Sequence, residues 1–139
     1  MTANGRPLWR RLFAVFVGLH GLAHLAGAGD LLDRARDGRS AGLLGGALTA
    51  SAPATVSAIG VAAALVAFGY VGTAVAIWQL DPRWPKLLRT VTIASLVVVV
   101  LTLWASLAGV FIDAALLVVA SRASRGDAMR GPAAAGARR

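Results

Sequence analysis

Charged side chains are absent from three long stretches of this chain and are concentrated in the segments between them. Residues 12–29 and 40–80 carry no charge, and residues 90–121 carry only Asp113. A helix that crosses a bilayer needs about 20 apolar residues, with roughly 17 as the lower limit. The pattern therefore predicts an all-α, polytopic membrane protein rather than a soluble domain.

The first two stretches each supply one membrane span. The first span is predicted at 12–28, which just reaches the required length. In the second stretch, Gly45, Gly46 and Pro53 interrupt the apolar run. Because proline is typical of the first turn of a helix, the second span is predicted at about 55–79.

The third stretch is too long for a single span. As one helix, residues 90–121 would be about 48 Å long at 1.5 Å per residue. This length exceeds a hydrocarbon core of roughly 30 Å, even for a tilted helix. We therefore expect a helical hairpin that turns near residues 106–109, with spans at about 88–105 and 109–121. The chain is thus predicted to form a four-transmembrane-helix bundle.

The remaining segments are predicted to lie outside the bilayer. Residues 1–11 form the N-terminal segment. Residues 29–54 form a loop on the opposite side, which either lies along the membrane surface or is disordered. Residues 124–139 are rich in Gly, Ala and Arg and have no apolar periodicity, so they are predicted to form a disordered basic tail near anionic headgroups. The residues between the two ends, 12–123, are predicted to form one membrane domain.

The basic residues predict the orientation, because Lys and Arg accumulate on the cytoplasmic side of a membrane. With a cytoplasmic N-terminus, eleven basic residues face the cytoplasm and three lie in the outer loop. A three-span arrangement would place the Arg-rich tail outside. The charge distribution therefore favours four spans in a bacterial inner membrane, with both termini cytoplasmic. A cleaved signal peptide ending near residue 28 is the alternative, and two histidines in its apolar core argue against it.

The overall charge changes this interpretation little. A formal net charge of +8 would suggest a nucleic-acid partner for a soluble chain. Here the Arg residues flank apolar runs, so membrane topology accounts for them. The expected partner is the lipid bilayer and not nucleic acid, and a homo-oligomer or a membrane-protein partner stays open. The chain has no Cys, which excludes disulfides and thiolate metal sites.

Four polar side chains within the predicted spans form the candidate site: His20, His24, Tyr70 and Asp113. The two histidines are spaced i, i+4 and therefore share one helix face. Counted from the cytoplasmic ends of their spans, His20 and Asp113 lie about 13 Å deep and Tyr70 about 15 Å deep. All three are therefore expected near the bilayer midplane. A stripe of hydroxyl side chains in the third span could bond to the same layer: Ser95, Thr102 and Ser106.

Three interpretations of this polar layer compete. In the structural one, Asp113 accepts hydrogen bonds from His20 or Tyr70 and holds the helices in register. In the second, the layer handles protons or a small solute, because histidine titrates near neutral pH and a midplane carboxylate can pass on a proton. In the third, His20, His24 and Asp113 bind zinc or iron. Haem is a further alternative, with either histidine as the axial ligand.

The sequence contains no recognisable nucleophile paired with a base and no phosphate-binding glycine loop. No Glu is present to act as a general base beside a metal. We therefore expect a non-enzymatic role, as an accessory or small-solute and proton-handling membrane protein without a required cofactor. The alternative is a metal- or haem-binding redox protein that uses His20, His24 and Asp113.

The segment LHGLAHLAG at residues 19–27 resembles the start of a group of small, largely uncharacterised bacterial four-helix membrane proteins, which open with a His-Gly-x-x-His segment. The likeness continues at residues 109–113, where the relatives are expected to carry Asn or a similar residue in place of Asp113. The resemblance implies a four-helix fold in a membrane and no particular activity. A likeness to DoxX-type proteins is one of architecture alone, and a shared fold does not imply a shared function.

Overall fold

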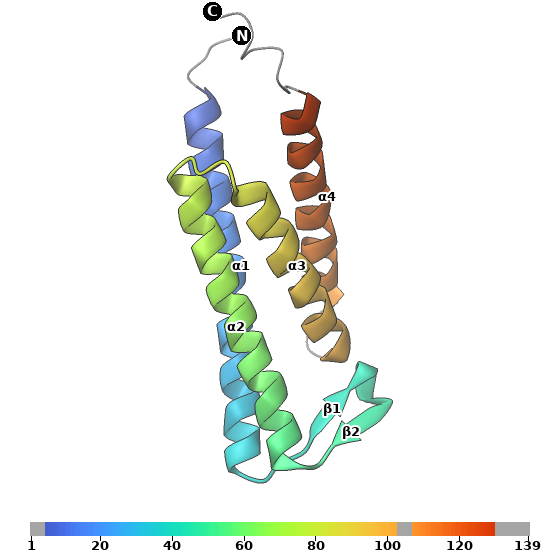
Figure 1. Cartoon of the computed structure of the whole chain (residues 1–139). Helices are drawn as coiled ribbons and strands as arrows, with labels where there is room; N and C mark the ends of the chain where they lie inside the picture. The colour runs from blue at the N-terminus through green and yellow to red at the C-terminus, as the bar shows by residue number, and fades with distance from the viewer. Residues whose placement is uncertain (1–4, 103–106, 130–139) are drawn as a thin grey trace, which may run out of the picture.

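A computed structural model describes residues 5–102 and 107–129 of the chain, which form four helices and one small hairpin (Figure 1). The helices are α1 (Gly5–Arg36), α2 (Pro53–Trp78), α3 (Trp84–Leu101) and α4 (Leu107–Met129). The hairpin consists of strands β1 (Ala41–Leu43) and β2 (Leu48–Ala50), joined by the 3-10 turn η1 (Leu44–Gly46). Each of the four helices is long and apolar enough to cross a membrane. The predicted all-α, four-helix membrane bundle is confirmed.

Helix α1 is longer than the predicted first span. No proline lies between residue 28 and the end of α1, and the Arg34 guanidinium pairs with the Asp30 carboxylate one turn earlier, with 2.8 Å between Nε and Oδ2. Such i, i+4 pairs stabilise a helix. The helix ends shortly before Gly38, whose φ of 67° is left-handed. The prediction of a loop from residue 29 is therefore wrong for residues 29–36, which are helical.

The rest of the predicted loop contains the antiparallel hairpin rather than irregular chain. Its turn requires left-handed backbone angles, which glycine adopts without a steric penalty, at Gly45 (φ 68°) and Gly46 (φ 90°). Ala41 and Ala50 are paired in the ladder and are buried with Val56 at the start of α2. The hairpin lies at the end of the bundle opposite the start of α1 and the end of α4 (Figure 1).

The later helices follow the predicted spans with shifted ends. Helix α2 matches the predicted 55–79 to within two residues. Helix α3 begins before the predicted residue 88, because Pro85 fits the first turn of a helix. Helix α4 extends beyond the predicted 109–121, so residues 124–129, predicted as disordered tail, are helical. The predicted turn and the end of the tail fall partly on residues 103–106 and 130–139, which lie outside the described residues.

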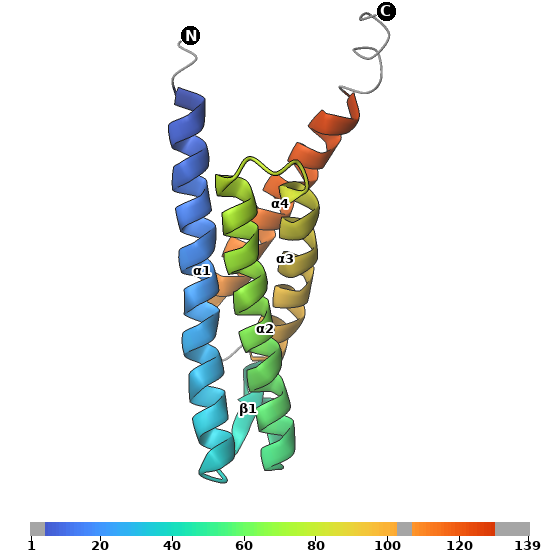
Figure 2. The same ribbon diagram turned by 60° about the vertical axis from the view of Figure 1, so that its left-hand side comes forward.

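The helices associate as two pairs, α1 with α2 and α3 with α4, which meet mainly where α2 contacts α3 (Figure 2). Small residues permit close approach between helices. A Cβ atom on Gly21 of α1 would lie 2.8 Å from the Tyr70 Cβ of α2. A Cβ atom on Gly69 of α2 would lie 2.6 Å from the Val91 Cγ2 of α3. These two glycines therefore set the spacing between the first three helices.

The outer surface of the bundle is apolar. Leu65, Phe68 and Phe111 are 67%, 64% and 75% exposed. In water, so many exposed apolar side chains would favour aggregation, whereas in a membrane they face lipid. The interior is lined mainly by alanine and valine and contains a few buried polar residues: His20, Thr73, Thr92, Ser95 and Asp113.

We expect Gly21→Ala to lower the free energy of unfolding by about 1–3 kcal/mol, because the added methyl group would meet Tyr70 and the backbone of Ala67. Gly72→Ala is the matched control, since a Cβ atom there meets nothing within 4 Å. Unfolding in mixed detergent micelles measures both variants. Equal stability of the two variants would contradict close packing of α1 on α2.

Candidate functional site

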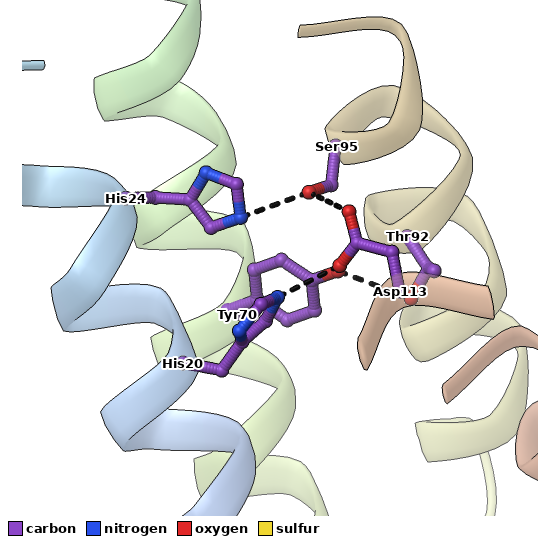
Figure 3. A network of polar contacts seen from close by, with 6 residues as sticks. All are labelled: His20, His24, Tyr70, Thr92, Ser95 and Asp113. Carbon is purple, nitrogen blue, oxygen red and sulfur yellow. Dashed lines mark hydrogen bonds and ion pairs between the residues drawn. The ribbon is translucent and has the colours of Figure 1, made fainter. Parts of the chain in front are cut away.

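Six polar side chains from all four helices meet in the interior of the bundle (Figure 3). Helix α1 supplies His20 and His24, α2 supplies Tyr70, α3 supplies Thr92 and Ser95, and α4 supplies Asp113. We call this set the polar cluster. Tyr70 and Asp113 are fully buried, and His20 is 8% exposed. The cluster therefore cross-links all four helices through polar contacts.

The Asp113 carboxylate is the centre of the cluster. Its Oδ1 accepts hydrogen bonds from His20 Nε2 and from the Tyr70 hydroxyl, both at 2.7 Å. Its Oδ2 accepts a hydrogen bond from the Ser95 hydroxyl. The Tyr70 oxygen also lies 3.3 Å from Thr92 Oγ1. An ionised carboxylate accepts all three hydrogen bonds, and His20 is its counter-ion when protonated.

His24 joins the cluster through Ser95, with 2.9 Å between His24 Nε2 and Ser95 Oγ. A serine hydroxyl has one proton, and Ser95 donates it to Asp113. His24 Nε2 must therefore be the donor to Ser95. The His24 ring stacks on Tyr70 at an interplanar angle of 17°, and its centroid lies 5.0 Å from that of His20. These contacts hold the half-buried His24 in one orientation.

A cavity of about 540 Å³ leads from the hairpin to this cluster. His20 and His24 line its inner end. Asp30 and Arg34 line the end nearer the hairpin, together with Gly42 of β1. The distance along α1 from His24 to Arg34 is about 15 Å, because ten residues each rise 1.5 Å. The two imidazoles are therefore buried between helices and yet reachable from one end of the bundle.

The donor set partly fits a metal ion. One nitrogen from each of His20 and His24 and one oxygen from Asp113 lie within 4.8 Å of one another, and zinc and iron accept these ligand types. However, His20 Nε2, His24 Nε2 and both carboxylate oxygens already bond within the cluster. Among the described residues, no fully buried side-chain nitrogen or oxygen lacks a partner. A metal held through these atoms would therefore replace existing hydrogen bonds.

The structure brings together all four residues that the sequence singled out: His20, His24, Tyr70 and Asp113. Asp113 bonds to both of the donors considered for it, His20 and Tyr70. Of the hydroxyl stripe, Ser95 enters the cluster. Thr102 instead donates to the backbone of its own helix, and Ser106 lies outside the described residues.

Thr92 was missed by the sequence reasoning. The signal for it was its position three residues before Ser95, which places both hydroxyls on one face of α3. Thr92 is fully buried, as is Ser95. Helical spacing from a residue already assigned to the cluster would therefore have found it.

Comparisons of the chain with protein-family models, with curated proteins and with solved structures give no match. These comparisons do not bear on the resemblance of residues 19–27, which stays a prediction. The function is therefore argued from the geometry of the polar cluster and its cavity.

We expect Asp113→Ala to lower the free energy of unfolding by about 3–5 kcal/mol, because three buried donors lose their acceptor together. Tyr70→Phe removes one of these donors and should cost about 1 kcal/mol. The double variant should cost less than the sum, since both changes act on one network.

Thr102→Val is the control for this series, because the Thr102 hydroxyl bonds only within its own helix turn in the described structure. Unfolding titrations in detergent micelles measure all four variants. If Asp113→Ala cost no more than Thr102→Val, the polar cluster would not be holding the helices together.

Proposed function

We propose that this protein is a multi-pass membrane accessory protein that receives a small solute in the cavity and takes up and releases a proton through the polar cluster. One observation carries the proposal. The cavity ends on His20 and His24, and hydrogen bonds lead from His24 through Ser95 to the buried carboxylate of Asp113. An intramembrane carboxylate with a defined path to a cavity is suited to taking up and releasing a proton.

The proton route follows from the direction of the hydrogen bonds. A proton that reaches the cavity binds to His24 Nδ1, and the proton on His24 Nε2 passes to Ser95 Oγ. The Ser95 proton passes at the same time to Asp113 Oδ2. One proton has then moved from the cavity to the carboxylate, Ser95 is unchanged, and His24 is again neutral as the other tautomer. Release reverses these steps.

The other members of the polar cluster support this exchange without taking part in it. His20 and Tyr70 hold Asp113 Oδ1, which leaves Oδ2 to receive the proton from Ser95. The stacking of Tyr70 on His24 fixes the imidazole that faces the cavity. The proposed role is non-enzymatic, because the solute leaves the cavity chemically unchanged.

We expect Ser95→Ala to slow the protonation of Asp113 at least about tenfold after a jump to acidic pH, because the hydroxyl that links His24 to the carboxylate is lost. Infrared difference spectroscopy follows the band of the protonated carboxyl group, and Asp113→Asn assigns it. Thr92→Val is the matched control on the same helix face, since Thr92 bonds to Tyr70 and not along the route. An unchanged rate in Ser95→Ala would overturn the proposed route.

The proposed location is the bacterial inner membrane, with both ends of the chain in the cytoplasm. Eleven basic residues on the proposed cytoplasmic side against three on the other support this orientation. The start of α1 and the end of α4 also lie at one end of the bundle, and the hairpin lies at the other (Figure 1). The surrounding partner is then the lipid bilayer.

The orientation can be tested by thiol labelling, because the chain has no Cys of its own. In spheroplasts, a membrane-impermeant maleimide should label Ser40→Cys, at the hairpin. Gln79→Cys, between α2 and α3, should react only after the membrane is permeabilised. Both positions are exposed. The opposite labelling pattern would show that the proposed orientation is inverted.

A metal- or haem-binding redox protein is the second candidate, favoured by the three ligand atoms within 4.8 Å of one another. It predicts that detergent-purified protein carries about one metal ion per chain, or a haem absorption band, and that the His20→Ala, His24→Ala double variant carries neither. Elemental analysis and absorption spectroscopy measure this. Equal metal content in wild type and double variant would remove the candidate.

A further inference from the structure

The side chains that line the cavity indicate which kind of solute it can hold. Between its two ends the cavity is lined mainly by small and branched apolar side chains, including Ala63, Val98 and Ile112. Within the described residues, the fully charged side chains that line it are Asp30 and Arg34, and these two pair with each other. The lining therefore favours an apolar, uncharged body, and the volume of about 540 Å³ is that of a small-molecule site.

The inner end of the cavity offers a hydrogen-bond acceptor. His24 Nε2 is committed as a donor to Ser95, which leaves Nδ1 as the second ring nitrogen. Nδ1 is turned away from Ser95 (Figure 3). Among the described residues, His24 Nδ1 makes no hydrogen bond, and every fully buried polar side-chain atom does make one. Nδ1 is therefore not fully buried, and it is open to the cavity that His24 lines. In a neutral imidazole with its proton on Nε2, Nδ1 is an acceptor.

His24 has no counter-ion bonded to it. The one carboxylate in the polar cluster, Asp113, bonds directly to His20, whereas His24 bonds to the Ser95 hydroxyl. A positive charge on the half-buried His24 would therefore have no bonded partner, which favours the neutral imidazole. The cavity therefore presents a lone pair, not a charge, at its inner end.

From this geometry we infer that the solute is an uncharged amphipathic alcohol, whose hydroxyl donates to His24 Nδ1 and whose apolar part fills the cavity toward Arg34. The inference rests on the proposed function and names the chemical class of its solute. The hydroxyl keeps its own proton and donates a hydrogen bond to the nitrogen where the proton route begins. A carboxylate has only acceptors and would face the His24 lone pair with another lone pair.

The test uses full-length protein in lipid nanodiscs with nitrogen-15-labelled histidine, and the two histidines of the chain give a simple spectrum. The probes are decanol, its methyl ether and decanoate. Decanol should shift the His24 Nδ1 signal saturably, and the ether and decanoate should bind at least about tenfold more weakly, since neither can donate a hydrogen bond. An equal effect of the ether, or a stronger effect of decanoate, would overturn the inference.

Two matched variants separate binding in the cavity from partition into lipid. Gly27→Leu adds a side chain into the cavity, where a Cβ atom meets nothing within 4 Å, and should abolish the decanol shift. Gly72→Leu adds the same side chain at an equally open, exposed position outside the cavity lining and should preserve it. An equal response in both variants would show partition only and would overturn the inference.

A third variant tests the acceptor atom. His24→Phe keeps a ring that can stack on Tyr70 and removes both ring nitrogens, so saturable binding of carbon-13-labelled decanol should weaken at least about tenfold. Undiminished binding would show that His24 is not the acceptor and would overturn the inference.

The two proposals can fail separately. If no decanol shift occurs in wild type while Ser95→Ala still slows the protonation of Asp113, the solute class is wrong and the proposed function stands. If decanol binds as described while Ser95→Ala has no effect on that rate, the solute class stands and the proton route is wrong.

Discussion

A buried carboxylate inside a membrane bundle must have hydrogen-bond donors, and this constraint organises the interior of the protein. Asp113 is fully buried, and water cannot solvate it there. Its oxygens accept from His20, Tyr70 and Ser95, which lie on three different helices. The relative rotation of all four helices is therefore tied to one side chain, because a change in any of them would leave a buried donor or the carboxylate unsatisfied.

This constraint compensates for a small apolar core. Many large apolar side chains of the chain face outward toward lipid, and α4 packs mainly on α3. Without a hydrophobic driving force between helices in lipid, close packing at small residues and polar contacts hold spans together. Gly21 and Gly69 bring α1, α2 and α3 within reach, and the polar cluster connects α4 to them across the bundle.

The hydrogen bonds that hold the helices together use only one of the two nitrogens of each histidine ring. Each imidazole has two nitrogens, and the polar cluster uses only Nε2 of His20 and of His24. The cavity reaches these rings from the hairpin end of the bundle. An imidazole whose Nε2 holds the helices together can therefore contact a solute through its Nδ1. Stability and the proposed proton exchange therefore depend on one network, and a substitution such as Asp113→Ala affects both.

The sequence by itself determined the four-helix membrane fold and the common level along the helices at which His20, Tyr70 and Asp113 meet. Hydropathy and the fixed rise of a helix are properties of each segment alone, so they can be read without knowledge of its neighbours. Only the tertiary structure decided the extension of α1 to Arg36, the hairpin, the role of Thr92 and the cavity beside His24. These features depend on how the helices rotate and pack against one another, which no single segment encodes.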